Sequence, residues 1–149
     1  MATIDEDIKT RFQNDKHRFI TNMIYTTHHF QNLFEEYLKP YGISSQQFNI
    51  LRILRGNGDW VKMNIIKELM MDKSPNTTRL ADKLKDKLLV DRKRSDSDRR
   101  VVYLKITQKG LELLKTMDEN DKGKHIEFIS RIDDEKAREF NKFLDMLRG

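Results

Sequence analysis

An uninterrupted helical repeat near the start of the chain limits the folds that this sequence can adopt. In residues 5–38, apolar side chains recur at three- and four-residue steps with charged residues between them, which is the spacing of an amphipathic helix. We expect one helix over this range, ended by Pro40 and Gly42. So long a helix exceeds what a chain of 149 residues needs to cover its own core, and we expect its apolar stripe to pack against a second copy of the chain. The stripe consists of Ile8, Phe12, Phe19, Met23, Thr27, Phe30, Phe34 and Tyr37.

Composition favours a polar, mostly helical protein and excludes several functional classes. Charged residues make up 36% of the chain, whereas about 25% is usual. The absence of cysteine excludes a disulfide framework and a thiol nucleophile. The acidic start and the absence of a long apolar run predict neither a secretion signal nor a membrane span. The sequence has no phosphate loop, no HExxH motif and no glycine-rich dinucleotide turn, so we expect no enzymatic activity and no cofactor.

The middle of the chain is predicted to hold two short helices joined by a tight turn. Ser44 and Gln47 have the spacing of a capping box, and the helix that they open should end at 56–58, before a very short strand at 60–61. A second short helix should then end at the turn 72–73. The apolar face of that helix consists of Met63, Ile66, Leu69 and Met70.

A third helix is predicted directly after this turn. Ser74 is suited to the N-cap and Pro75 to the first helical position, where its missing N–H costs nothing. We expect the helix to reach about Lys87. Its buried stripe is predicted to be Leu80, Ala81 and Leu84, and its exposed residues Asn76, Arg79, Lys83 and Lys87.

Strand character is confined to two segments beyond this helix, 89–90 and 101–106, and the polar residues 92–100 join them as a hairpin. Thr107 is suited to cap a further helix, and a final helix carries apolar residues from Ala137 to Leu147. The sequence therefore predicts a mainly α (α+β) fold, a winged helix-turn-helix with long N- and C-terminal dimerisation helices. Its predicted parts are an N-terminal dimerisation helix (1–40), the winged helix-turn-helix (44–107) and C-terminal dimerisation helices (108–149), intertwined in one fold unit.

The positive charge of the chain is confined to one part of this arrangement. Residues 73–109 contain 12 Lys/Arg and 5 Asp/Glu, whereas the other 112 residues contain 17 and 19. A helix fits the major groove of DNA, and a narrow hairpin can follow the backbone into the minor groove. Ser74, Asn76 and Thr78 would supply neutral hydrogen-bonding groups there, Arg79 could reach guanine edges or phosphate, and Lys83 is suited to phosphate.

Three segments, Ser74–Leu84, Leu89–Arg92 and Asp98–Gly110, resemble the MarR family of bacterial and archaeal transcriptional regulators, and the resemblance extends over roughly residues 44–117. It implies a homodimer with two winged-helix lobes below a helical interface. It also implies that Arg100 enters the minor groove, that Asp98 braces it and that Arg99 contacts phosphate. The complete set of expected DNA-binding residues is Ser74, Pro75, Asn76, Thr78, Arg79, Lys83, Arg94, Asp98, Arg99 and Arg100.

The chain departs from that family at two positions. Leu88 stands where the family commonly has glycine, and Thr77 stands where an aliphatic residue is usual. Because leucine does not readily adopt the left-handed conformation that closes a helix, we expect this helix to end differently and to tilt the wing.

Members of the MarR family often respond to small aromatic or phenolic ligands held between the dimer helices and the DNA-binding lobe. Residues that could line such a site are Tyr25, His29 and Phe48, with His28, Phe30 and Trp60 as further candidates. The alternative, which is favoured for most of them, is that these side chains form the core or the dimer interface.

The histidines His17, His28, His29 and His125 are expected to be structural, and no metal is expected. The first pair to consider, His28 and His29, are adjacent and point about 100° apart on a helix, which prevents easy chelation of one ion.

The leading hypothesis is therefore a homodimeric regulator that binds double-stranded DNA sequence-specifically. We expect a ligand-responsive repressor at a pseudo-palindromic operator, cytoplasmic and nucleoid-associated. The alternative is a winged-helix protein-interaction module without DNA binding.

Overall fold

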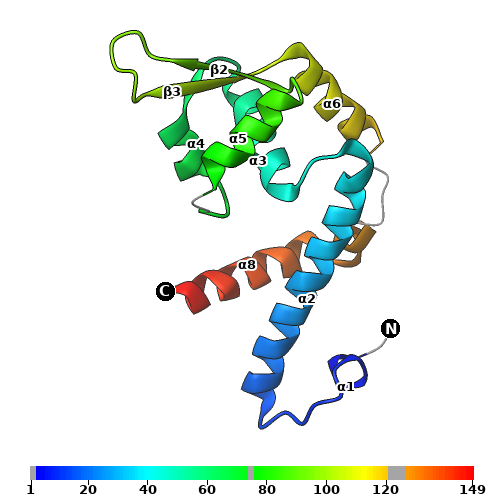
Figure 1. Ribbon diagram of the computed structural model, residues 1–149. Coiled ribbons are helices and arrows are strands. Elements are labelled where there is room, and N and C mark those ends of the chain that lie inside the picture. Colours follow the sequence, from blue (N-terminus) through cyan, green and yellow to red (C-terminus); the bar gives the residue numbers. More distant parts are fainter. Residues whose placement is uncertain (1–2, 74–75, 121–126) are drawn as a thin grey trace.

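The computed structural model describes residues 3–73, 76–120 and 127–149 and shows a winged-helix lobe attached to a helical arm (Figure 1). Helices α3 to α6 and a small sheet form the lobe, α2 projects from it, and α8 lies across α2 (Figure 1). The rings of Phe19 and Phe143 meet where α2 and α8 contact each other, with centroids 5.5 Å apart. The elements are α1 (Ile4–Asp7), α2 (Asp15–Leu38), η1 (Lys39–Tyr41), α3 (Ser45–Asn57), β1 (Val61–Lys62), α4 (Met63–Leu69), α5 (Thr77–Asp86), β2 (Val90–Arg94), β3 (Val102–Ile106), α6 (Gln108–Glu119), η2 (Phe128–Arg131) and α8 (Asp134–Arg148).

The predicted single helix over residues 5–38 is wrong in its first part. The chain forms the short helix α1, leaves helical geometry, and begins α2 only at Asp15. The side chain of Asn14 accepts a hydrogen bond from the backbone N–H of His17 at 2.9 Å, which satisfies a free donor at the start of α2. Such a local side-chain contact competes with continuation of the helix through Asn14. Arg18 pairs with Asp5, which ties α1 to α2.

Short-range capping signals are confirmed. Ser44 and Gln47 form both hydrogen bonds of the predicted capping box, and α3 ends at Asn57 before its C-cap Gly58, whose φ of 72° is left-handed. The Thr107 side chain accepts from the N–H of Gly110 at 3.1 Å and caps α6.

The hydrophobic core lies within the winged-helix lobe. Leu114 and Met117 of α6 are buried in the same cluster as α3, α4 and α5, and the Tyr37 hydroxyl donates to the Met117 carbonyl at 3.0 Å. These contacts attach the C-terminal end of α2 and the whole of α6 to the lobe. Fully buried side chains of this core include Leu38, Ile50, Leu51, Leu54, Ile66, Leu84 and Leu104.

Leu69 is exposed, contrary to the prediction that it shares the buried face of its helix. Helix α4 ends at Leu69, and the next residue, Met70, has extended backbone geometry. This change of direction turns Met70 into the core and leaves Leu69 outside.

The sheet is antiparallel in the order β1-β3-β2, with β3 in the centre. Strands β2 and β3 pair from Val90↔Ile106 to Arg94↔Val102. Their connecting loop projects away from the helices as the wing (Figure 1). The helix-turn-helix, the wing and the flanking helices together confirm the predicted fold class.

The expectation that Leu88 would make α5 end differently is wrong. Leu88 adopts the left-handed conformation with φ 61°. The Leu88 N–H donates to the Lys85 carbonyl at 2.8 Å and the Leu89 N–H donates to the Leu84 carbonyl at 3.0 Å, which are the two bonds of a Schellman motif. Thr107 donates its hydroxyl to the Leu88 carbonyl at 2.8 Å, so the start of α6 holds the strained turn in place.

Candidate nucleic-acid interface

Helix α5 presents a polar face to solvent. Its predicted first residues, Ser74 and Pro75, lie outside the described part of the chain, and α5 is described from Thr77 with Asn76 at the N-cap. The structure exposes the predicted contact residues Asn76, Thr78, Arg79 and Lys83. Thr77, in contrast, is buried in the lobe.

The wing holds Arg100 in a fixed geometry. The Asp98 carboxylate accepts from the Arg100 Nε at 3.1 Å and from its Nη2 at 3.3 Å, and also from the Arg100 backbone N–H at 3.0 Å. The side-chain hydrogen bond from Arg100, with the backbone bond second, lowers the pKa of Asp98. Because the Arg100 side chain remains 91% exposed, its guanidinium is oriented without being covered. Arg94 and Arg99 are also exposed on the wing.

A depression of about 390 Å³ connects α5 with the wing. Thr78 of α5 and Arg100 of the wing both line it, so two elements that are separate in sequence border one concave surface. Among the described residues, the predicted DNA-binding residues outside this lining are Asn76, Arg79, Lys83, Arg94, Asp98 and Arg99. The cations of the lining are Lys62, Lys67, Arg92 and Arg100.

Lys62, Lys67 and Arg92 line the depression but were not among the residues predicted from the sequence. Lys62 pairs with Tyr103 in the sheet register, and Lys67 lies on α4, so both precede the basic segment 73–109. The predicted short strand at 60–61 was the one indication of their position. If that strand joins the same sheet as the hairpin, the residues next to it lie close to the wing. Arg92 lies in the basic run but its partner on α5, Asp82, could not be read from the sequence.

Trp60 directly precedes β1, and its ring lies beside Lys93 of β2. The Lys93 Nζ lies 4.3 Å from the centroid of the Trp60 ring and 5.9 Å from that of Tyr103. A cation over two aromatic faces is a stabilising arrangement. Nearby, Lys105 donates to the Asp59 carboxylate at 3.0 Å, and this hydrogen bond lowers the pKa of Asp59.

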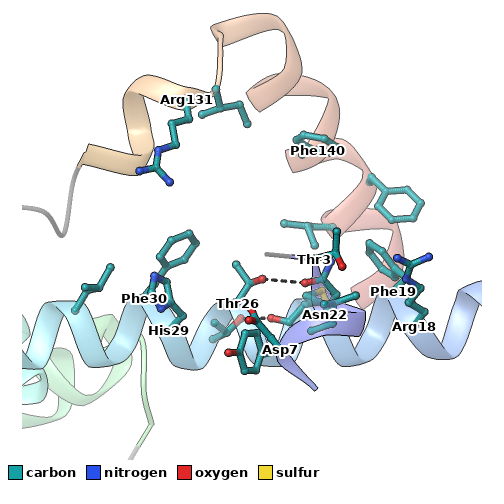
Figure 2. Close-up of a pocket in the computed structure, with 18 of the residues that line it drawn as sticks. Thr3, Asp7, Arg18, Phe19, Asn22, Thr26, His29, Phe30, Arg131 and Phe140 are labelled. Carbon is teal, nitrogen blue, oxygen red and sulfur yellow. Dashed lines mark hydrogen bonds between the residues drawn. The ribbon is translucent and has the colours of Figure 1, made fainter. Parts of the chain in front are cut away.

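A second concave surface, a groove of about 1360 Å³, lies between α1, α2, η2 and α8 (Figure 2). Figure 2 shows His29 and Phe30 on α2, with Arg131 and Phe140 across the groove. The structure thus brings the predicted residues Tyr25 and His29 together in one lining. Phe48 lies elsewhere, with its ring centroid 5.3 Å from that of Phe34 at the edge of the core. His28 is exposed on α2 outside this lining.

Two further results concern only the described residues. Among residues 3–73, 76–120 and 127–149, no three His, Asp or Glu side chains are close enough together to hold a metal ion. His125 falls outside these ranges. None of the helices in this part of the chain is both long and apolar enough to cross a membrane.

A helix-turn-helix followed by a β-hairpin, with exposed cations on both, defines a winged helix-turn-helix protein. The chain belongs to the family of SarA/Rot transcriptional regulators, whose family model matches residues 32–117. It is 30% identical over 102 residues to the HTH-type transcriptional regulator MhqR of Bacillus subtilis. The aligned region covers 68% of this chain and 70% of that protein.

Solved structures share the same architecture. A putative MarR-like transcription regulator from Bacillus cereus matches with a TM-score of 0.77 and 21% identity, covering 90% of this chain and 96% of the other. A mutant of MarR from E. coli, solved in complex with operator DNA, matches with a TM-score of 0.76 and 20% identity, covering 93% and 99%. The resemblance to the MarR-type regulators is confirmed.

Proposed function

We propose that this chain is a transcriptional regulator that binds double-stranded DNA sequence-specifically as a homodimer, with no catalytic activity of its own. The observation that carries the proposal is the shared depression of Thr78 and Arg100, because it joins a helix of major-groove size to a cation on a projecting hairpin. The similarity to a regulator solved in complex with operator DNA supports it. Such a regulator acts on the chromosome, so the proposed location is cytoplasmic and nucleoid-associated.

The proposed contacts follow from exposure and side-chain chemistry. Helix α5 enters the major groove, where Asn76, Thr78 and Arg79 contact base edges and Lys83 contacts phosphate. Ser74 and Pro75 precede this face in sequence and belong to the same proposed contact region. On the wing, Asp98 orients Arg100 toward the minor groove, and Arg94 and Arg99 contact phosphates. Lys62 and Lys67 extend the cationic surface toward the DNA backbone.

The helical arm is the proposed dimer interface. None of the described residues of α8 is buried, although its side chains include Phe140 at 53% and Met146 at 65% exposure. Phe19, Ile20 and Ile24 expose further apolar surface on α2. Large apolar patches exposed on a soluble monomer often mark interaction surfaces, and a second copy that packs on α2 and α8 would cover these side chains. We propose that residues 1–40 and 108–149 supply this interface and residues 44–107 the DNA-binding part; a monomer in light scattering would refute this.

A dimer places two copies of α5 in successive major grooves about one helical turn apart, which requires a pseudo-palindromic operator. We propose that the protein represses transcription from it and responds to a small aromatic ligand, with Tyr25 and His29 in contact with that ligand in the groove. Addition of phenolic compounds should then lower operator affinity in the wild type and not in Tyr25→Ala.

The central test is selection of bound fragments from the source genome, followed by titration of the selected site and of random DNA at several salt concentrations. A preferred site with a steep salt dependence is expected, because binding of cations to phosphates releases counterions. Absence of a preferred site would refute sequence-specific binding. A flat salt response would favour the protein-interaction alternative.

Arg100→Ala tests the wing. We expect operator affinity to fall by about tenfold or more, with unchanged helical circular dichroism because the side chain is exposed. Arg52→Ala removes an exposed arginine from α3, outside α5, the wing and the helical arm, and serves as the matched control. Equal affinities of the two variants would contradict the assignment of Arg100.

A further inference from the structure

One ion pair links the middle of α5 directly to the wing. The Arg92 Nη1 on β2 donates to the Asp82 Oδ1 on α5 at 2.5 Å. The Arg92 side chain is 24% exposed and that of Asp82 47%, so the pair is partly shielded from water. Of the described ion pairs, this is the one that joins α5 to a strand.

The pair spans the turn between α5 and β2. Helix α5 ends at Asp86 and β2 begins at Val90, with the left-handed Leu88 between them. On the core side of this turn, Leu84 of α5 and Val90 of β2 are buried in the same hydrophobic cluster. The contact between Asp82 and Arg92 adds a second point of attachment, four residues before the helix end and two residues into the strand. Together with the packing of the core, this polar contact restricts the angle between α5 and the wing.

The same pair also fixes one wall of the depression. Thr78 lies one helical turn before Asp82, on the same side of α5, and both Thr78 and Arg92 line the depression. Arg92 is therefore held beside the residue that is proposed to contact bases. Its guanidinium is already engaged by the protein, and a free DNA phosphate would have to compete with Asp82 for it.

We propose that Asp82 is a positioning residue for DNA recognition: by holding Arg92 it sets the angle between α5 and the wing that specific binding requires. This inference rests on the proposed DNA-binding function. It is notable because Asp82 is an acidic residue on a surface proposed to face a polyanion. Charge alone favours its removal, whereas positioning requires its presence.

Removal of the Asp82 charge and loss of its positioning role should therefore change operator affinity in opposite directions. The full-length Asp82→Ala variant is compared with Asp86→Ala, which removes the same charge from the same helix and breaks no ion pair within the described part of the chain. Affinity is measured for the selected operator and for random DNA at one salt concentration. Loss of positioning lowers operator affinity by about two- to fivefold, the factor that corresponds to a partly exposed ion pair.

Asp86→Ala should bind the operator as tightly as the wild type or more tightly. The ratio of operator affinity to random-DNA affinity should fall in Asp82→Ala alone, because a charge effect changes both affinities in the same direction. Asp82→Glu keeps a carboxylate within reach of Arg92 and should recover most of the ratio. Circular dichroism and the urea midpoint of each variant verify that the protein is folded.

The outcomes separate this inference from the proposed function. One outcome is that the wild type prefers an operator while Asp82→Ala has the same or a higher ratio of operator affinity to random-DNA affinity. In that case Asp82 has no positioning role and the proposed function stands. If the ratio of operator affinity to random-DNA affinity falls equally in Asp82→Ala and Asp86→Ala, the cause is removal of charge or loss of helix. The inference is then also overturned. A wild type without any preferred site overturns both proposals.

Discussion

Gly110 lies at a point where two parts of the fold approach too closely for any side chain. It occupies the first turn of α6, next to the junction between α5 and β2. A Cβ atom there would overlap the carbonyl oxygen of Leu89 and lie 2.7 Å from Ile106 Cγ1. The Leu89 carbonyl cannot move freely, because it accepts the N–H of Thr107 at 3.1 Å. We therefore expect Gly110→Ala to push α6 away from the base of the wing.

The expected cost follows from the groups that must move. Overpacking of a tight site costs about 1–3 kcal/mol, and weakening of the bond between Thr107 and Leu89 adds about 1 kcal/mol. The better helix propensity of alanine returns up to about 1 kcal/mol. The net expectation is a loss of about 1–3 kcal/mol in the free energy of unfolding.

Gly56→Ala provides a matched control for this prediction. Gly56 lies within α3, and a Cβ atom built there meets nothing within 4 Å. The same substitution should therefore stabilise the protein by about 0.5–1 kcal/mol through helix propensity. Urea unfolding followed by circular dichroism measures both variants. A Gly110→Ala protein as stable as Gly56→Ala would refute the close approach described above.

Two further predictions concern the α5 turn and the wing. At position 88, glycine should give a protein about 0.5–1 kcal/mol more stable than alanine, since a φ of 61° strains any side chain; urea unfolding of Leu88→Gly and Leu88→Ala measures this, and the reverse order would contradict it. In an NMR titration, the pKa of Asp98 should lie below the ordinary aspartate value and rise toward it in Arg100→Ala, because Arg100 favours the carboxylate form. Its folded-state pKa is lowered, so the brace is present at neutral pH and is lost as the pH falls through that lowered value. An Asp98 midpoint that is the same in both proteins would show that Arg100 does not interact with it in solution.

The sequence alone determined the features that depend on neighbours a few residues apart. The capping box of Ser44, the N-cap at Thr107, the exposed face of α5 and the hairpin were all predictable, because caps, helical periodicity and strand alternation are local. The concentration of positive charge in residues 73–109 predicted which part of the chain would form the cationic surface. The segment 8–14 was mispredicted because its apolar spacing fits a helix, whereas Asn14 caps the helix that begins after it.

Only the tertiary structure decided how separate segments meet. Leucine at position 88 disfavours a left-handed turn by itself, but bonds from Thr107 and Leu89 hold it there, and the distant start of α6 supplies one of them. The partner of Arg92 is ten residues away on another element, and the depression with Thr78 and Arg100 requires helix, sheet and loop to be assembled at once. Long-range contacts of this kind leave no periodic trace in a single sequence. The position of the positive charge along the chain was therefore predictable from the sequence, whereas the shape of the surface that it forms depends on tertiary packing.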